Sequence, residues 1–296
     1  MRIIRTDSHA GSWYVDDAER LGSQLSSWLC KPSEDLKPAK AIIVPHAGYK
    51  YSGACAAYAF KQLDPEKIKR VFIFGPSHHL DIGSRCALSS ATECETPFYN
   101  LTVDEEVCDQ LKDTGEFVFL TIEKDEAEHS VEMQLPYIAK LMENHRNEFK
   151  IVPIVVGSLN AEKEALYGRI FAPYLSDPST VFVISSDFCH WGERFRYQYY
   201  HKKDGAIWQS IENLDRMGMR AIETLDPPEF SAYIQNYNNT ICGRRGISVL
   251  LHAVATARRK SELKWEMKFV HYAQSSHCQS MADSSVSYAA GVLMVR

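Results

Sequence analysis

Three short apolar segments each run directly into a histidine or an aspartate, side chains that can bind a metal ion or transfer a proton. The three are residues 41–44 before His46, residues 71–74 before His78 and His79, and residues 181–184 before Asp187 and His190. Segments this short and this rich in β-branched and aromatic residues are typical of buried strands covered on both faces. Because ligands of such sheets bind where strands end and loops converge, we expect these side chains to share one site.

The histidines that follow the first two segments are weak signals when each is taken alone. His46 precedes Ala47 and Gly48, and the glycine lets the backbone turn tightly. On its own, His46 is better explained as a loop histidine at the end of a strand. His78 and His79 are adjacent, so their side chains point in different directions and at most one enters a given site.

The third segment adds a carboxylate and a histidine at a spacing of three residues. Asp187 and His190 share a face if the turn after the strand is helical. Both could then be ligands, or the carboxylate could orient a histidine that acts as an acid–base group. The alternative for Asp187 is a helix N-cap, and we expect Cys189 between them to pack in the interior.

A cysteine later in the chain is a further candidate ligand. Cys242 precedes Gly243 and a helix that is expected to follow, with Arg244 and Arg245 close by. A thiol in such a position is expected to have a lowered pKa, which favours the thiolate. Thiolate binds iron, copper or zinc well, whereas a buried inert thiol is an equally favoured alternative.

Histidine and aromatic residues in polar segments are candidates for the walls of a cleft. His129 precedes Ser130, a candidate helix N-cap, and could reach the pocket. Trp13 and Tyr51 lie in polar, glycine-containing segments. They could line the mouth of a cleft, although packing in the core explains them at least as well.

Apolar periodicity predicts an α/β fold that would position these residues. Helices are expected at 17–29, 52–63 (with Ser52 as its cap), 104–113, 161–175, 204–225, 228–237 and 247–259, and strands at 40–44, 70–75, 151–156, 180–184, 265–272 and 286–295. The last two strands could pair antiparallel, which gives a mixed, mostly parallel sheet with helices on both faces. Pro136 implies a kink or break in the helical pattern over 130–143.

The composition and charge of the chain argue against several classes of protein. The 296 residues show no linker or repeat, so we expect residues 1–296 to form a single domain. A net charge of -5 argues against a nucleic-acid partner, and no apolar stretch is long enough for membrane insertion. Without a signal-peptide pattern, a cytoplasmic or nuclear protein is the default. The eight cysteines include no C-x-x-C pair, which favours free thiols.

Several blocks of the sequence together resemble the Memo family, whose members are named as mediators of receptor-driven cell motility. The blocks are Gly11-Ser-Trp13-Tyr14, Pro45-His46-Ala-Gly-Tyr, Gly75-Pro-Ser-His78-His79, Glu128-His129-Ser130, Ser185-Ser-Asp187-Phe-Cys-His190-Trp-Gly, Thr240-Ile-Cys242-Gly243 and Ser284-Ser-Val-Ser-Tyr-Ala-Ala-Gly. The resemblance covers essentially the whole chain.

The resemblance implies a fold like that of the class III extradiol dioxygenases, which hold Fe(II) with two histidines and a glutamate. By this resemblance His46 and His78 correspond to the ligand histidines and His190 to the acid–base residue. Cys242 falls where the family replaces the glutamate. A thiolate ligand favours softer metals, so the resemblance implies iron or copper rather than ring-cleaving activity.

Three hypotheses about function follow. The first is a metal-binding redox and signalling protein that links receptor tyrosine kinases to cell motility and the cytoskeleton and affects superoxide and metal balance. Its partners would be cytoskeletal signalling proteins. The second is a non-catalytic module whose cleft, with Trp13, Tyr51 and His129, binds a phosphotyrosine peptide of a receptor tail or adaptor. Phosphate capture would then require Arg244 and Arg245. The third is an active dioxygenase of unknown substrate.

Overall fold

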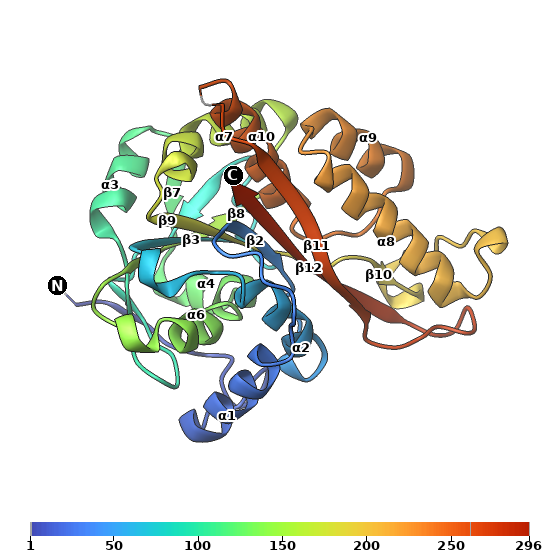
Figure 1. The fold of residues 1–296 in the computed structure, drawn as a ribbon, viewed down its shortest axis with the longest axis horizontal. Coiled ribbons are helices and arrows are strands. Elements are labelled where there is room, and N and C mark those ends of the chain that lie inside the picture. Colours follow the sequence, from blue (N-terminus) through green and yellow to red (C-terminus); the bar gives the residue numbers. More distant parts are fainter. Residues whose placement is uncertain (1, 261, 296) are drawn as a thin grey trace.

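The computed structural model describes residues 2–260 and 262–295 and has an α/β fold built on a large mixed sheet (Figure 1). The strands are β1 (Ile4–Arg5), β2 (Ala39–Val44), β3 (Arg70–Pro76), β4 (Cys86–Leu88), β5 (Glu93–Cys94), β6 (Leu101–Thr102), β7 (Phe117–Phe119), β8 (Lys150–Val156), β9 (Thr180–Ser185), β10 (His190–Trp191), β11 (Trp265–Gln274) and β12 (Ser285–Val295). The helices are α1 (Ala18–Leu29), α2 (Tyr49–Phe60), α3 (Glu105–Asp113), α4 (Ile122–Glu126), α5 (His129–Glu132), α6 (Leu135–Leu141), α7 (Ala161–Ser176), α8 (Ile207–Glu223), α9 (Pro227–Tyr237) and α10 (Arg244–Arg258).

The order of strands in the larger sheet brings the predicted site residues to one edge. In the described part of the chain the order is β10-β12-β2-β9-β3-β8-β4-β7, with β11 paired to β12, and β1, β5 and β6 form a small separate sheet. The central strands β2, β9, β3 and β8 are parallel, and the pairs of β12 with β2 and of β4 with β8 are antiparallel. The carboxyl ends of β2, β9 and β3 therefore lie side by side. The predicted mixed sheet and the antiparallel pairing of the last two strands are confirmed.

Helices cover the sheet on both faces (Figure 1). Helices α7 and α10 pack on each other and on β9, while α2 packs on β2, β11 and β12. Every residue of β2 and of β9 is buried, as expected for apolar strands covered on both sides. One cluster of buried hydrophobic residues runs through the described chain. That residues 1–296 form one domain stays a prediction.

Two predicted helix caps differ from the structure. Helix α2 begins at Tyr49 with Gly48 as its N-cap, and Ser52 lies in the first turn, where its hydroxyl donates to the Ala47 carbonyl. The predicted cap at Ser130 is also wrong, because Glu128 caps α5 by accepting from the Ser130 N–H.

The helical pattern over 130–143 is interrupted, as Pro136 implied. Helix α5 ends at Glu132 and α6 begins at Leu135, with Pro136 in its first turn. Proline fits there because the first turn leaves its N–H groups without partners inside the helix.

All eight cysteines are free, as predicted. Within the described residues no helix is long and apolar enough to cross a membrane.

Candidate metal centre

A cluster of potential metal ligands lies at the edge where β2, β3 and β9 end. The ligand atoms of His46, His78 and Cys242 all lie within 4.8 Å of one another. His46 Nε2 and Cys242 Sγ are 3.2 Å apart. His46 is only 2% exposed, so its ring contributes to the cluster from the protein interior. The structure thus brings together the three residues expected to hold a metal, while their role as ligands stays a prediction.

Hydrogen bonds fix which nitrogen of His46 carries the proton. Its Nδ1 lies 2.8 Å from Ser185 Oγ. The Ser185 hydroxyl donates its one proton to the Ser130 carbonyl, and the side-chain amide of Gln134 donates to the same oxygen. Ser185 Oγ can therefore only accept from His46, so Nδ1 is protonated and the Nε2 lone pair faces Cys242. Burial, followed by the neighbouring His78, lowers the pKa of His46 and keeps the ring neutral.

The protonated nitrogen of His78 is likewise fixed by its hydrogen-bond partner, the buried Glu128. Nδ1 of His78 lies 2.9 Å from Glu128 Oε1, and the backbone N–H of His78 donates to Oε2 at 2.6 Å. Burial acts to raise the pKa of Glu128, but hydrogen bonds from His78 and from the Ser130 backbone lower it to about 2. The ionised carboxylate only accepts, so Nδ1 is protonated and Nε2 is left for a metal. Metal-binding histidines are commonly held in this way by an outer partner.

Asp187 holds the loop that carries His46. Its Oδ1 accepts from the backbone N–H groups of His46 at 2.9 Å and Ala47 at 3.3 Å. Burial raises the pKa of this carboxyl group, an effect that the nearby His190 opposes. Among the described residues, Asp187 is not part of a group that could hold a metal. The N-cap alternative is wrong, because residues 186–189 form no helix and the element that follows β9 is β10.

His190 is held by backbone carbonyls, although not in the helical turn that its spacing suggested, and its acid–base role stays a prediction. It begins β10, where it pairs with Val286 of β12, so Asp187 and His190 do not share a helix face. Its Nδ1 lies 3.0 Å from the Phe188 carbonyl and 3.3 Å from the Thr240 carbonyl. Both are acceptors, so Nδ1 is protonated and Nε2 is free to accept a proton.

The structure contradicts the expected effect of the arginines on Cys242. Burial of the thiol and the charge of Asp187 raise the pKa of Cys242. Arg245 instead forms an ion pair with Glu164, N to O 2.7 Å, and Arg244 donates to the Ile241 carbonyl. At neutral pH the S–H group therefore persists, with two acceptors in reach, His46 Nε2 at 3.2 Å and the Asp187 carbonyl at 3.5 Å. Metal binding would replace that proton.

Aromatic rings extend the site on one side. The His129 ring stacks on His78 with centroids 4.6 Å apart, and Trp13 lies 4.3 Å from His129. Burial, followed by the proximity of the His46 and His78 imidazoles, lowers the pKa of His129 to about 3. His78, Glu128 and His129 form a second group whose ligand atoms lie within 4.8 Å. Trp13 and His129 therefore lie beside the cluster.

Three other candidates lie apart from the cluster. Tyr51 is 55% exposed, and its described ring contact is with Lys50 Nζ at 5.5 Å. Of the adjacent pair only His78 belongs to a described ligand group, as expected, and the His79 ring lies 6.3 Å from the His78 ring between centroids. Cys189 is fully buried and packs in the core, as predicted.

A buried ion network fixes the N-terminal segment that carries Trp13. The fully buried Arg5 guanidinium contacts Asp125 at 3.2 Å and Glu132 at 2.8 Å. Glu132 also accepts from His9 Nδ1 at 2.8 Å and from the Tyr14 hydroxyl at 2.9 Å. These bonds hold the chain around Trp13 against α4 and α5.

Sequence reasoning missed the partners that set the histidine tautomers. Glu128 stands directly before His129, and a carboxylate among histidines was a usable signal. Ser185 ends the same strand that leads to Asp187, which places it at the site edge. Gln134 gives no local signal, because its role depends on the break between α5 and α6.

Fold and site together define an α/β protein with two imidazoles and a thiol arranged as a group that could hold a metal ion. The family described as Memo-like protein matches residues 5–292, and the chain belongs to that family. The chain is 53% identical over 293 residues to Protein MEMO1 of Homo sapiens and of Rattus norvegicus, covering 99% of this chain and 98% of each relative. It is 46% identical over 292 residues to Protein memo-1 homolog of Caenorhabditis elegans, covering 98% of this chain and 83% of that protein. The likeness to extradiol dioxygenases stays a prediction.

Proposed function

We propose that this chain binds iron or copper through His46, His78 and Cys242 and acts as a redox and signalling protein. The observation that carries the proposal is the convergence of two imidazole nitrogens and one thiol sulfur within 4.8 Å. Imidazole and thiolate together suit iron and copper, and the thiolate favours the softer Cu(I). Such a metal would supply one-electron chemistry when bound.

The surrounding residues support this donor set. Ser185 and Glu128 hold the Nδ1 protons of the two histidines, which leaves both Nε2 atoms as ligands. Asp187 fixes the backbone at His46. His190 Nε2 would accept or return a proton beside the site, so any enzymatic activity would be that of a metal-dependent oxidoreductase.

Membership of the Memo-like family supports the signalling part of the proposal. The protein would link receptor tyrosine kinase signals to cell motility and the cytoskeleton, and would affect superoxide and metal balance. We place this function in the cytoplasm or nucleus, with cytoskeletal signalling proteins as partners.

A phosphotyrosine-peptide module is the alternative, and an active dioxygenase of unknown substrate is a further one. The exposed edge of Trp13 beside His129 favours a cleft that could contact a peptide. Arg245, however, is already paired with Glu164, which weakens the case for an arginine pair that captures phosphate.

Metal content of untagged protein purified anaerobically tests the proposal. We expect near-stoichiometric iron or copper by mass spectrometry, lost in His46→Ala and Cys242→Ser and retained in His277→Ala, a histidine stacked on Trp208. Unchanged metal in Cys242→Ser would refute the ligand assignment. A wild-type protein that neither contains metal nor takes up Fe(II) or Cu(I) would overturn the proposal, and phosphopeptide binding by that protein would support the alternative.

A further inference from the structure

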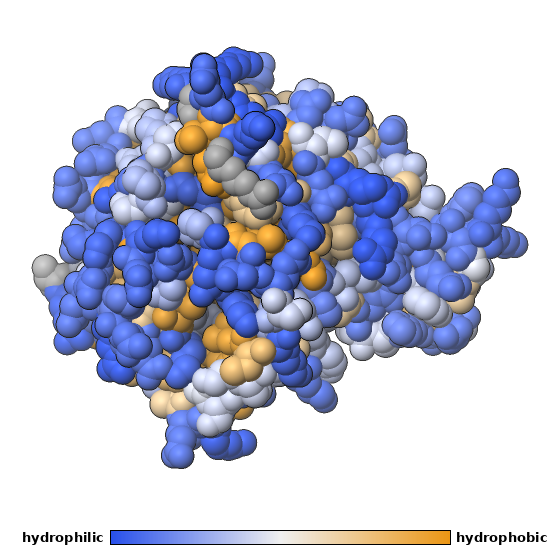
Figure 2. Space-filling view, viewed as in Figure 1, coloured by the Kyte–Doolittle hydropathy of each residue, from blue (hydrophilic) through white to orange (hydrophobic). Residues whose placement is uncertain are grey.

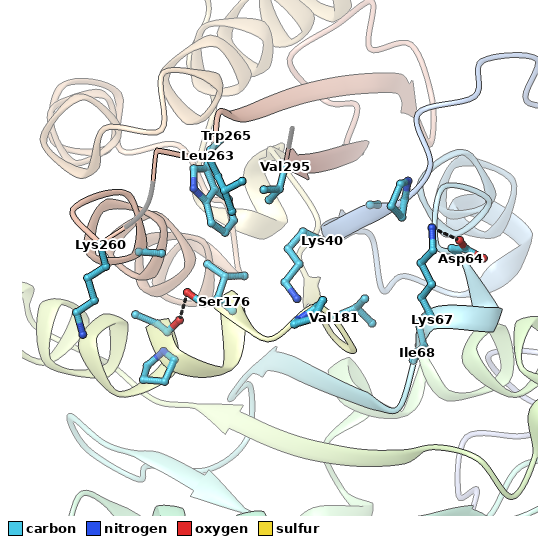
Figure 3. Close-up of a pocket in the computed structure, with 17 residues that line it drawn as sticks. Lys40, Asp64, Lys67, Ile68, Ser176, Val181, Lys260, Leu263, Trp265 and Val295 are labelled. Atoms are coloured by element: carbon cyan, nitrogen blue, oxygen red, sulfur yellow. Dashed lines mark hydrogen bonds and ion pairs between the residues drawn. The ribbon is translucent and has the colours of Figure 1, made fainter.

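A cavity of about 530 Å³, whose lining residues are drawn in Figure 3, lies at the amino ends of β2 and β9, opposite the strand ends that carry the candidate metal centre. Lys40 and Val181, at the beginnings of β2 and β9, line it, whereas His46 and Asp187 follow the ends of the same two strands. The last turns of α7 and α10, the start of β11 and the end of β12 complete the wall. The volume is in the range of small-molecule sites.

Lys40 brings a buried ammonium group to this cavity. The residue is 9% exposed, and its Nζ donates to the backbone carbonyls of Asp177 and Thr180. An ammonium group has three donors, so one stays available. Among the described residues no ion pair neutralises this charge. Burial lowers the pKa of Lys40 to about 8, against the opposing charge of Asp177, as expected for a desolvated amine without a close counter-ion.

Trp265 brings a second donor that lacks a partner. The residue is 8% exposed, and within residues 2–260 and 262–295 its indole Nε1–H has no hydrogen-bond partner. The ring lines the cavity wall together with Leu263 and Val295 (Figure 3). Buried donors in folded proteins are normally satisfied, so an unpaired one beside a cavity points to an acceptor atom supplied by a ligand.

The remaining lining is mostly apolar, with a positive balance of charge. Besides Lys40, the described lining contains the basic residues Lys67 and Lys260. The acidic residue in this described lining, Asp64, is paired with Lys67 at 3.0 Å. This local charge is opposite in sign to the net charge of -5 of the chain. Figure 2 shows apolar surface (orange) near the end of β12, on a face that is otherwise largely hydrophilic.

We propose that this cavity binds a small amphipathic carboxylate, whose carboxylate group pairs with Lys40 and whose apolar body packs beside Trp265. The Lys40 ammonium favours an anionic ligand, and the apolar wall favours a ligand with a hydrocarbon body. The available donors of Lys40 and Trp265 favour oxygen acceptors. The site is independent of the proposed metal centre.

Calorimetric titration of the full chain with octanoate, octanol and octylammonium tests the assignment. We expect saturable one-to-one binding of octanoate, with weaker binding of octanol and none of octylammonium. Lys40→Met should weaken octanoate binding at least about tenfold, since it removes one partner of a buried charge pair. Lys202→Met, at an exposed lysine elsewhere, is the matched control.

A second pair of variants covers the case in which Lys40→Met does not fold. Ser176 is exposed at the cavity rim, so Ser176→Glu adds a negative charge there and Ser176→Gln adds similar bulk without charge. Only the glutamate variant should weaken octanoate binding. Equal affinity for octanoate and octanol, no saturable octanoate binding, or insensitivity to both Lys40→Met and Ser176→Glu would overturn the proposal.

Discussion

His46 Nε2 and Cys242 Sγ lie 3.2 Å apart although 196 positions separate the two residues in the chain. Two local features make this approach possible. His46 follows β2, and Asp187, just after the neighbouring strand β9, donates its backbone N–H to Cys242 Sγ at 3.2 Å. A hydrogen bond thus fixes the Cys242 thiol to the end of β9, while the thiol faces the His46 ring, which follows β2.

Gly243 is expected to be necessary for this approach. A Cβ atom at this position would lie 2.5 Å from the Ser185 carbonyl oxygen, so Gly243→Ala must push the Cys242 turn away from β9. We expect a loss of about 1–3 kcal/mol in unfolding free energy and weaker metal binding, measured by chemical denaturation and metal titration. Gly246→Ala is the control, because its Cβ would meet only ordinary contacts at 3.5 Å and beyond. Equal effects of the two variants would contradict this explanation.

Glu128 should control metal affinity through His78 without touching the metal. Glu128→Gln replaces a carboxylate that only accepts by an amide that can also donate, so the His78 tautomer is no longer fixed. We expect affinity for Fe(II) or Cu(I) to fall about 10–100-fold in competition titrations with a chelator. Glu123→Gln, on the exposed side of α4, should leave affinity unchanged. If the metal affinity of Glu128→Gln is unaltered, a contact other than the one with Glu128 fixes the His78 tautomer.

Arg5 should be far more important for stability than Arg2, three positions earlier. Arg5→Met leaves the buried carboxylates of Asp125 and Glu132 without their cation, and breaking a buried pair costs about 3–5 kcal/mol. Arg2→Met removes only an exposed contact with Glu93 and should have little effect, because exposed pairs contribute little. Urea denaturation of both variants provides the comparison, and similar midpoints would refute the role of the network.

The network also predicts a dependence of stability on pH. Burial acts to raise the pKa of Glu132, but hydrogen bonds from His9 and the charge of Arg5 lower it from 4.5 to about 2. A carboxyl group with a depressed pKa in the folded state stabilises it above pH 4.5, and this contribution is lost as pH falls toward 2.

The wild-type protein should therefore exceed Glu132→Gln in unfolding free energy by less at acidic pH than at neutral pH. We expect the difference in unfolding free energy to shrink by about 2 kcal/mol between about pH 6 and about pH 3. A difference that stays constant over this range would show that the glutamate is not held ionised by its neighbours.

Sequence patterns predicted the strands of the site well because their signals are local. Runs of β-branched residues mark β2, β3 and β9, and residues directly after parallel strands share one sheet edge. The predicted grouping of His46 with His78 follows from this rule alone. The family resemblance added Cys242 as their companion.

The errors arose where the outcome depends on tertiary contacts. The turn after β9 could not be recognised as extended, because β10 exists only through its pairing with β12. The direction of the Cys242 pKa shift was misjudged because the fold buries the thiol beside Asp187, while Arg245 pairs with Glu164 on α7. Hydrogen-bond partners such as Gln134 depend on how the chain turns between two short helices, which no nearby residue pattern specifies.

The position of β12 has a consequence for synthesis of the protein on the ribosome. Strand β2 lies between β9 and β12, and β12 is encoded almost the whole chain later. One edge of β2 therefore stays without a partner while most of the chain is translated, and an unpaired apolar strand edge invites association with other chains. Chaperone dependence during translation would be expected to centre on this strand, which ends immediately before the His46 loop.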